Sequence, residues 1–109
     1  MSARSQLLKG ILEGCILAIM VREEVYGYEL SVKLAENGFT FVSEGSIYPV
    51  LLRLQKENLI EGTMRASPNG PKRKYYHLTA EGHEALAAFK ANWKEIKISV
   101  DQILTKLGE

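Results

Sequence analysis

The chain has 109 residues, of which 46% are hydrophobic and 25% charged, which is typical of one soluble globular domain and excludes a disordered or low-complexity chain. The formal net charge is only +1, so binding to nucleic acid requires that the positive charge be concentrated locally. The single cysteine, Cys15, cannot form an internal disulfide, and we expect a reducing compartment and a small core side chain. The apolar stretch 7–21 is interrupted by Lys9, Glu13 and Gly14, so we expect no membrane span, no signal peptide and a cytoplasmic location.

The first half of the chain predicts helices. Apolar residues recur at helical spacing over 5–21, which predicts an amphipathic helix that ends before the polar segment 22–25. A second, shorter helix is predicted to begin near Tyr26 and to end at Asn37 and Gly38. Glycine suits this end because it accepts the left-handed backbone conformation that closes many helices.

A third helix is predicted after the connector 39–42, ending near Asn58. Either Ser43 or Ser46 can cap it, because Pro49 is tolerated in a first turn under both starts. Its inward-facing apolar residues are expected to be Ile47, Val50, Leu51 and Leu54.

Beyond the third helix the apolar spacing becomes that of β-strands. Residues 59–66 and 72–79 predict two strands, and the segment 67–71 between them is rich in turn-forming residues. We therefore expect a β-hairpin whose loop is longer than the tightest type. The segment 62–80 contains no acidic residue, so positive charge gathers there. Its basic residues are Arg65, Lys72, Arg73 and Lys74.

The last helix is predicted from a cap at Thr79 to Leu107, with Glu81 and Glu84 beside its positive N-terminal end. At 1.5 Å per residue it would be about 40 Å long and would extend beyond a compact domain. Its apolar residues are spaced alternately three and four apart, as in a heptad seam. They are Leu86, Phe89, Trp93, Ile96, Val100, Ile103 and Leu107. We expect this seam to form a homodimer, and the alternative is that it covers only the chain's own core.

The order of these elements predicts a mainly α fold with a small β-hairpin. Three helices, a hairpin and a long helix form a winged helix-turn-helix followed by a C-terminal helix. We therefore divide the chain into a DNA-binding domain, 1–79, and a dimerisation helix, 80–109. In such a fold the third helix enters the major groove of double-stranded DNA, and the basic hairpin, or wing, contacts phosphates or the minor groove.

The expected DNA contacts lie mainly on the third helix and the wing. Ser46 can read a base edge or hold a phosphate, Tyr48 offers a hydroxyl and a flat ring, and Arg53 can bind a phosphate or a guanine. The full set of expected DNA-binding residues is Tyr28, Ser46, Tyr48, Pro49, Arg53, Lys72, Arg73 and Lys74. The alternatives are that Tyr48 packs against the first helix, and that Arg53 and the hairpin are merely solvated.

Three motifs, found in this order, resemble those of the PadR-like transcriptional regulators. They are YGYEL at 26–30, EGSIYPVLLRL at 44–54 and KRKYYHLTAEG at 72–82. The resemblance covers nearly the whole chain and implies a winged-helix fold, a dimer formed through the C-terminal helix and repression at a promoter palindrome. The single C-terminal helix resembles the short subfamily. Asn58 departs from the pattern, since many relatives carry Asp-Gly or Lys-Gly there, and we expect only a small change in that turn.

Trp93 lies where multidrug-binding members of the short subfamily place a tryptophan that stacks flat aromatic ligands at the dimer centre. The resemblance therefore implies a small hydrophobic or aromatic effector. Its pocket would be apolar and drawn from the first and last helices, with the walls Leu8, Leu12, Phe89 and Trp93. The alternative is that Trp93 is a core ring at a seam position.

The sequence contains no recognisable catalytic motif. His77 and His83 have no carboxylate pair or nucleophile at a telling spacing, and phosphate-binding, dinucleotide-binding and metal-binding motifs are absent. We therefore expect no enzyme activity, no cofactor and no metal. The remaining alternative to a DNA-binding regulator is a winged-helix module that binds protein. The low net charge would suit such a module, but a wing free of acidic residues argues against it.

Overall fold

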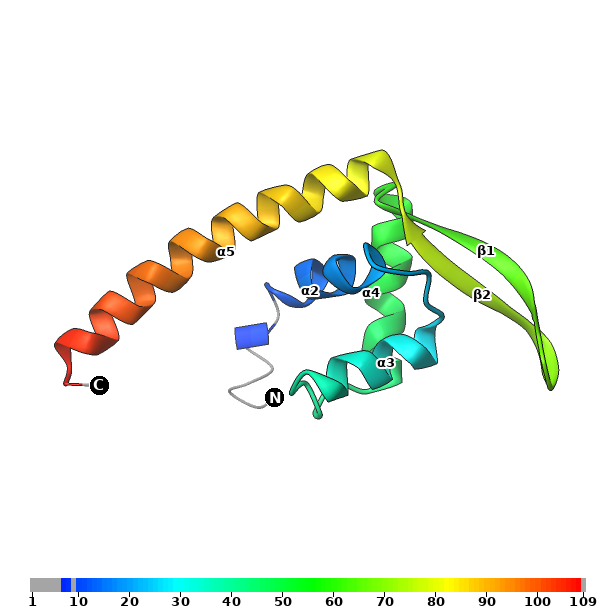
Figure 1. The fold of residues 1–109 in the computed structure, drawn as a ribbon, viewed down its shortest axis with the longest axis horizontal. Helices are drawn as coiled ribbons and strands as arrows, with labels where there is room; N and C mark the ends of the chain where they lie inside the picture. The colour runs from blue at the N-terminus through cyan, green and yellow to red at the C-terminus, as the bar shows by residue number, and fades with distance from the viewer. Residues whose placement is uncertain (1–6, 9, 109) are drawn as a thin grey trace.

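A computed structural model describes residues 7–8 and 10–108. In chain order its elements are α2 (Leu12–Met20), α3 (Gly27–Glu36), α4 (Glu44–Lys56), β1 (Ile60–Ser67), β2 (Gly70–Leu78) and α5 (Ala80–Lys106) (Figure 1). The two strands form one antiparallel sheet. This arrangement confirms the predicted mainly α fold with a small hairpin.

The first predicted helix, 5–21, is wrong in one respect, because it is not continuous. Residues 7–8 are helical, the chain turns at Gly10 and Ile11, and α2 begins only at Leu12. The Ile11 N–H donates to the Leu8 carbonyl oxygen at 2.9 Å, which closes this turn. Glycine is a poor helix former, so Gly10 is where a break costs least. Residues 1–6 and 9 of the predicted helix lie outside the described residues.

The end of α3 and the start of α4 lie where the sequence predicts them. The chain leaves α3 through Gly38, whose φ of +100° is the left-handed conformation expected of it. At the start of α4 the Ser43 side chain accepts a hydrogen bond from the Ser46 N–H at 3.2 Å, so Ser43 is the cap. Pro49 therefore lies inside α4, in its second turn. After α4, Asn58 takes a positive φ of 61° and directs the chain into the hairpin.

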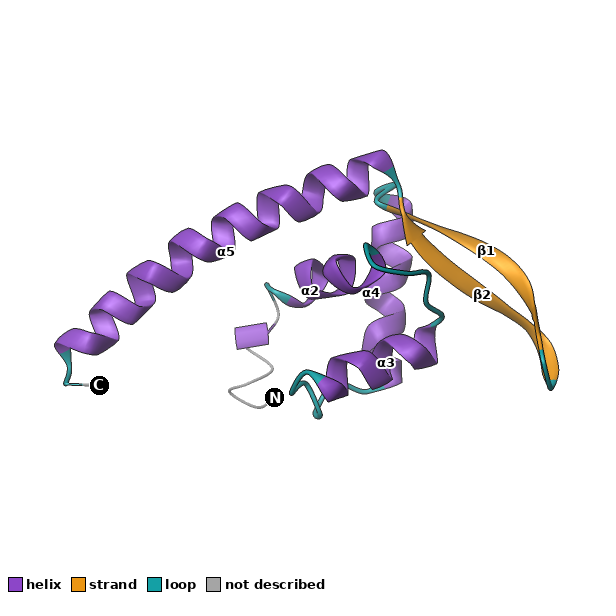
Figure 2. Cartoon of the chain, in the orientation of Figure 1, coloured by secondary structure: helices purple, strands orange, loops and turns teal. Residues whose placement is uncertain are grey.

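The hairpin is tighter than predicted. Only Pro68 and Asn69 separate the strands, because Gly70 and Pro71 belong to β2. The Ser67 hydroxyl donates to the Pro71 carbonyl oxygen at 2.8 Å and holds the two strand ends together. Figure 2 shows the strands, in orange, extending well away from the helices. The hairpin is buried only at its base, so its outer part is free to contact a partner.

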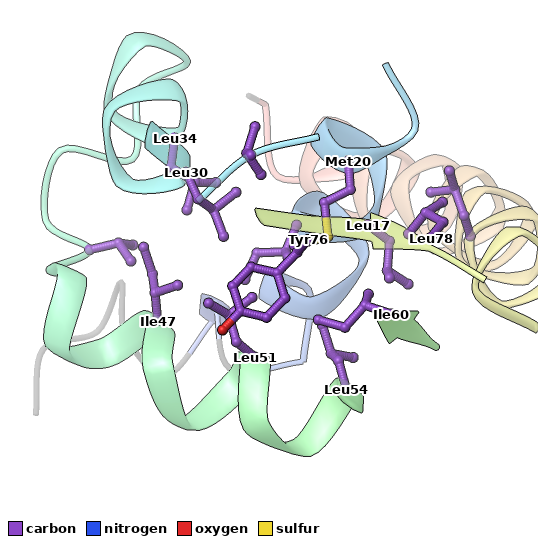
Figure 3. Packing of buried hydrophobic residues seen from close by; sticks show 14 of the residues in the cluster. Leu17, Met20, Leu30, Leu34, Ile47, Leu51, Leu54, Ile60, Tyr76 and Leu78 are labelled. Atoms are coloured by element: carbon purple, nitrogen blue, oxygen red, sulfur yellow. The ribbon is translucent and has the colours of Figure 1, made fainter. Parts of the chain in front are cut away.

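The hydrophobic core joins the helices to the base of the hairpin. Its fully buried side chains come from α2, the loop before α3, α3, α4 and β1, and they are Ile16, Val25, Leu30, Leu34, Ile47, Leu51, Leu54 and Ile60. Figure 3 shows the Tyr76 ring of β2 near the centre of this cluster. Burial raises the pKa of the Tyr76 phenol. A two-way backbone bridge between Val25 and Tyr76, with N···O distances of 3.3 and 2.8 Å, attaches the loop before α3 to the wing.

Only the first turns of α5 belong to this core. The Thr79 hydroxyl oxygen accepts from the Gly82 N–H at 3.0 Å and caps the helix, as predicted. Leu86 is buried in the chain's own core, and the Phe89 ring covers Gly14 of α2 so closely that a Cβ at Gly14 would overlap it. Beyond Phe89 the helix is exposed and runs away from the domain on the side opposite to the wing (Figure 1). Among the described residues, no helix combines the length and the apolar character needed to cross a membrane.

Candidate nucleic-acid interface

One flank of α4 faces α2. Arg53 Nη2 lies 3.0 Å from Glu13 Oε1, so the charge of Arg53 is balanced by a carboxylate of the same protomer. Ser46 lies two turns before Arg53 and therefore on the same flank. Its hydroxyl is 2.9 Å from the Ser43 Oγ at the helix start. Arg53 is thus neither a free cation nor a merely solvated one, and a phosphate would have to compete with Glu13 for it.

The other flank of α4 faces α3. The Tyr48 hydroxyl donates to Glu44 Oε2 at 2.8 Å, and this hydrogen bond to a carboxylate raises the pKa of the Tyr48 phenol. The Tyr48 ring lies against Gly27, where a Cβ would come within 2.9 Å of the hydroxyl oxygen. Tyr48 therefore packs against the start of α3, while about half of its surface remains exposed.

The wing is tied to the helices by two of its three consecutive basic residues. The Arg73 guanidinium lies 4.5 Å from the centre of the Tyr26 ring, in a cation–π contact just before α3. The Lys74 ammonium donates to Gln55 Oε1 of α4 at 3.5 Å. Lys72 is exposed and makes no hydrogen bond or ion pair with any described residue. Of the three, Lys72 is therefore the one most available to an external anion.

A cluster of charged side chains at the base of the wing was not predicted from the sequence. Glu24, in the loop before α3, accepts two hydrogen bonds of 2.9 Å from Arg65, and this guanidinium holds the pKa of the Glu24 carboxyl below its usual range. His77 Nε2 lies 3.2 Å from Glu61 Oε2, and its Nδ1 lies 3.9 Å from Glu24 Oε1. Both carboxylates come from distant parts of the sequence, so no spacing around His77 indicated them. These residues fasten the wing to the loop, and the described part of the chain contains no set of side chains suited to hold a metal ion.

These contacts bring the start of α3, one flank of α4 and the wing together. Tyr28, in the first turn of α3, is exposed, and its ring centre lies 6.5 Å from that of Tyr26. Tyr28 and Tyr48 therefore lie near the wing base, whereas Ser46 and Arg53 lie on the opposite flank of α4. Pro49 is exposed between the two flanks. The sequence analysis missed one exposed apolar residue of α4, Leu52, because it singled out only polar and aromatic residues and Pro49 there.

The four residues predicted to line an effector pocket are in different environments. Leu8 is buried, Leu12 and Phe89 are partly buried, and Trp93 is 42% exposed. A groove of about 510 Å³ lies elsewhere, between α2 and α3. It is lined by none of those four, and its walls include Cys15, whose thiol pKa is raised by burial.

The predicted dimer seam divides at Phe89. Leu86 and Phe89 pack on the chain's own domain, so for these two residues the alternative interpretation of the seam applies. The rest of the seam forms an exposed apolar stripe on α5. This seam stripe consists of Trp93, Ile96, Val100, Ile103 and Leu107.

Comparison with known proteins gives consistent matches over most of the chain. The model of the PadR-like family of transcriptional regulators matches residues 16–88. A crystal structure of a PadR-like transcriptional regulator from Bacillus cereus is 65% identical, covers 92% of this chain and 97% of its own, and has a TM-score of 0.84. A Streptococcus transcriptional regulator is 47% identical, with coverages of 90% and 96% and a TM-score of 0.82. A Lysinibacillus sphaericus protein whose name assigns no function is 32% identical over 106 residues, covering 95% of this chain and 97% of its own.

Proposed function

The chain belongs to the family of PadR-like transcriptional regulators, and on this premise we propose that it represses transcription by binding a palindromic operator as a homodimer. DNA-binding regulation, as opposed to enzyme catalysis, follows from the family itself. The proposal rests on one observation: Tyr48 joins α4 to the start of α3, and Lys74 joins the wing to α4, so three elements present one surface. Since its partner is chromosomal DNA, we place the protein in the cytoplasm.

We assign the parts of this surface different roles. In the proposed complex α4 lies in the major groove, with Ser46, Tyr48 and Pro49 near its start. Tyr28 and Lys72 contact phosphates on either side, because both are exposed at the edges of the surface. Arg53 contributes a further phosphate or base contact when it exchanges Glu13 for DNA. Arg73 and Lys74 mainly hold the wing in place, since both already have partners within the protomer.

The homodimer of this proposal forms through the seam stripe. A two-fold axis would pair each seam stripe with its copy and bury both, as isologous interfaces do. The functional division into a DNA-binding part, 1–79, and a dimerisation helix, 80–109, is retained in the proposal. Leu86 and Phe89, however, serve mainly to join the helix to its own domain.

The first test is a titration against a labelled duplex from the gene's own upstream region, at two salt concentrations, with a scrambled duplex as competitor. Lys72→Ala is expected to weaken binding about equally on all sequences and to reduce the slope of log affinity against log salt by about one per protomer. Lys90→Ala, which removes an exposed cation from α5, is the matched control and should change neither quantity. If neither the upstream duplex nor a genome-wide fragment selection gives a preferred site, the regulator proposal fails.

We further propose that a planar apolar effector binds beside Trp93 in the dimer and weakens operator binding. Trp93 is the only tryptophan and is 42% exposed in the protomer, so its emission reports directly on this place. Titration with anilinonaphthalene sulfonate, an aromatic probe of apolar sites, is expected to quench this emission with saturation and to release the operator over the same concentration range. Quenching without release would show that a ligand can bind there but does not regulate the protein.

A further inference from the structure

The outward face of α4 carries an apolar side chain that the fold does not use. Leu52 is 64% exposed, whereas Ile47, Leu51 and Leu54 of the same helix are fully buried. At 100° per residue, Leu52 lies about 130° around the helix from the centre of the buried side of α4, so it faces outward. Pro49 and Gly45 fall on the same outward strip, about one and two turns earlier respectively. The strip therefore offers its partner no side-chain hydrogen-bond donor or acceptor along these three positions.

The two flanks of α4 fix this strip in place. Tyr48 packs against Gly27 on one flank, and Arg53 pairs with Glu13 on the other, so α4 cannot easily turn about its axis. A partner that approaches the outward face of α4 therefore contacts Leu52. Lys56 lies one turn further along the strip and is exposed, so the apolar strip ends in a cation. This combination favours an occupant that carries negative charge beside apolar points on its surface, and a purely apolar protein surface fits it less well.

The major groove of DNA has this character. Every base pair presents hydrogen-bonding groups there, but only thymine also presents a methyl group. A side chain without donors or acceptors distinguishes bases by burying that methyl group. We propose that Leu52, with Pro49 beside it, packs on a thymine methyl group in each half of the operator and selects thymine at that position. This inference rests on the proposed function and adds a determinant of specificity to it.

The test compares thymine with deoxyuridine, which lacks only the methyl group. An operator found by fragment selection with the full-length protein is synthesised with each thymine of a half-site replaced in turn by deoxyuridine. At one position we expect the affinity of the wild-type protein to fall about three- to fivefold, the loss of one buried methyl group. Substitution in both half-sites should lower it by about tenfold or more.

Leu52→Ala, combined with the deoxyuridine substitution, completes a double-mutant cycle between Leu52 and the thymine methyl group. It should lower the affinity for the thymine operator by a similar factor and should bind the deoxyuridine operator no more weakly than the thymine one. Ile98→Ala is the matched control, because Ile98 is similarly exposed, at 51%, but lies on α5 and away from the seam stripe. It should retain both the affinity and the sensitivity to deoxyuridine. Thermal unfolding of both variants checks that the exposed substitutions leave the fold intact.

Several results would overturn the inference. If no single deoxyuridine weakens binding, or if its effect persists in Leu52→Ala, Leu52 does not read a methyl group. If Leu52→Ala binds the thymine operator as tightly as the wild type, the strip serves another partner, such as a protein. All three leave the proposed function standing, because the operator is still bound. Failure to select any operator, in contrast, would remove the proposed function itself.

Discussion

Replacing Val100 and Ile103 together by aspartate is expected to convert the protein to a monomer and to lower operator affinity at least about a hundredfold. Both side chains belong to the seam stripe and are exposed in the protomer. Burying such a residue fully contributes about 1.5–3 kcal/mol. A two-fold interface would contain each substitution twice, and every aspartate would also have to be desolvated. Sedimentation equilibrium gives the oligomeric state, and the salt titration described above gives the affinity.

Ile98→Asp provides the control for this pair. Ile98 lies on the same helix, exposed, but about half a turn away from the seam stripe. It should leave the dimer and the operator affinity unchanged, which would exclude a general effect of negative charge on α5. A double variant that remains dimeric would show that the copies associate through another surface.

Gly82→Ala is expected to destabilise the protein by about 2–3 kcal/mol, the range of a severe overpacking substitution. A Cβ at Gly82 would overlap the carbonyl oxygen of Leu59, a backbone atom that cannot rotate away. The same oxygen accepts a 3.1 Å hydrogen bond from the Thr79 N–H, so its displacement would also disturb the cap of α5. Urea unfolding at one fixed protein concentration measures the loss, because dimer stability depends on concentration.

Gly10→Ala is the corresponding control, since a Cβ at Gly10 would have nothing within 4 Å. We expect its unfolding free energy to stay within about 0.5 kcal/mol of the wild type, as for most exposed substitutions. If Gly82→Ala unfolds at the same midpoint urea concentration as the wild type, α5 can move away from Leu59 at little cost in free energy.

Those parts of the fold that depend on local signals could be predicted from the sequence. The cap at Thr79, the left-handed stop at Gly38 and the inward stripe of α4 need only neighbouring residues, and the structure has all three. The break at Gly10 and the tight turn at Pro68 and Asn69 were missed. In both places several backbone paths satisfy the same local preferences, and packing of the rest of the chain selects one of them.

The candidate site was less predictable because its ion pairs join residues that are far apart in the sequence. Glu24 pairs with Arg65 across 41 positions of sequence, and no spacing rule connects them. The pairing of Arg53 with Glu13 is similar, since it depends on how α4 crosses α2. The basic residues could thus be listed from the sequence. Which of them are free to bind an external anion, and which are paired within the fold, could not be predicted. That question is decided by partners that only the folded chain brings close.

At Phe89, α5 packs closely on Gly14 of α2, and the residues of α5 beyond Phe89 are exposed. Beyond Phe89 the helix projects from the domain, and in the proposed dimer it joins the domain to the dimer interface. A tilt of about 10° at this contact moves a point about 20 Å away by about 3.5 Å, which is close to the axial rise of about 3.4 Å per base pair of DNA. In the proposed dimer, this contact would therefore set the angle between the domain and α5. A change at Phe89 too small to disturb the core could move α4 by about one base pair along the operator.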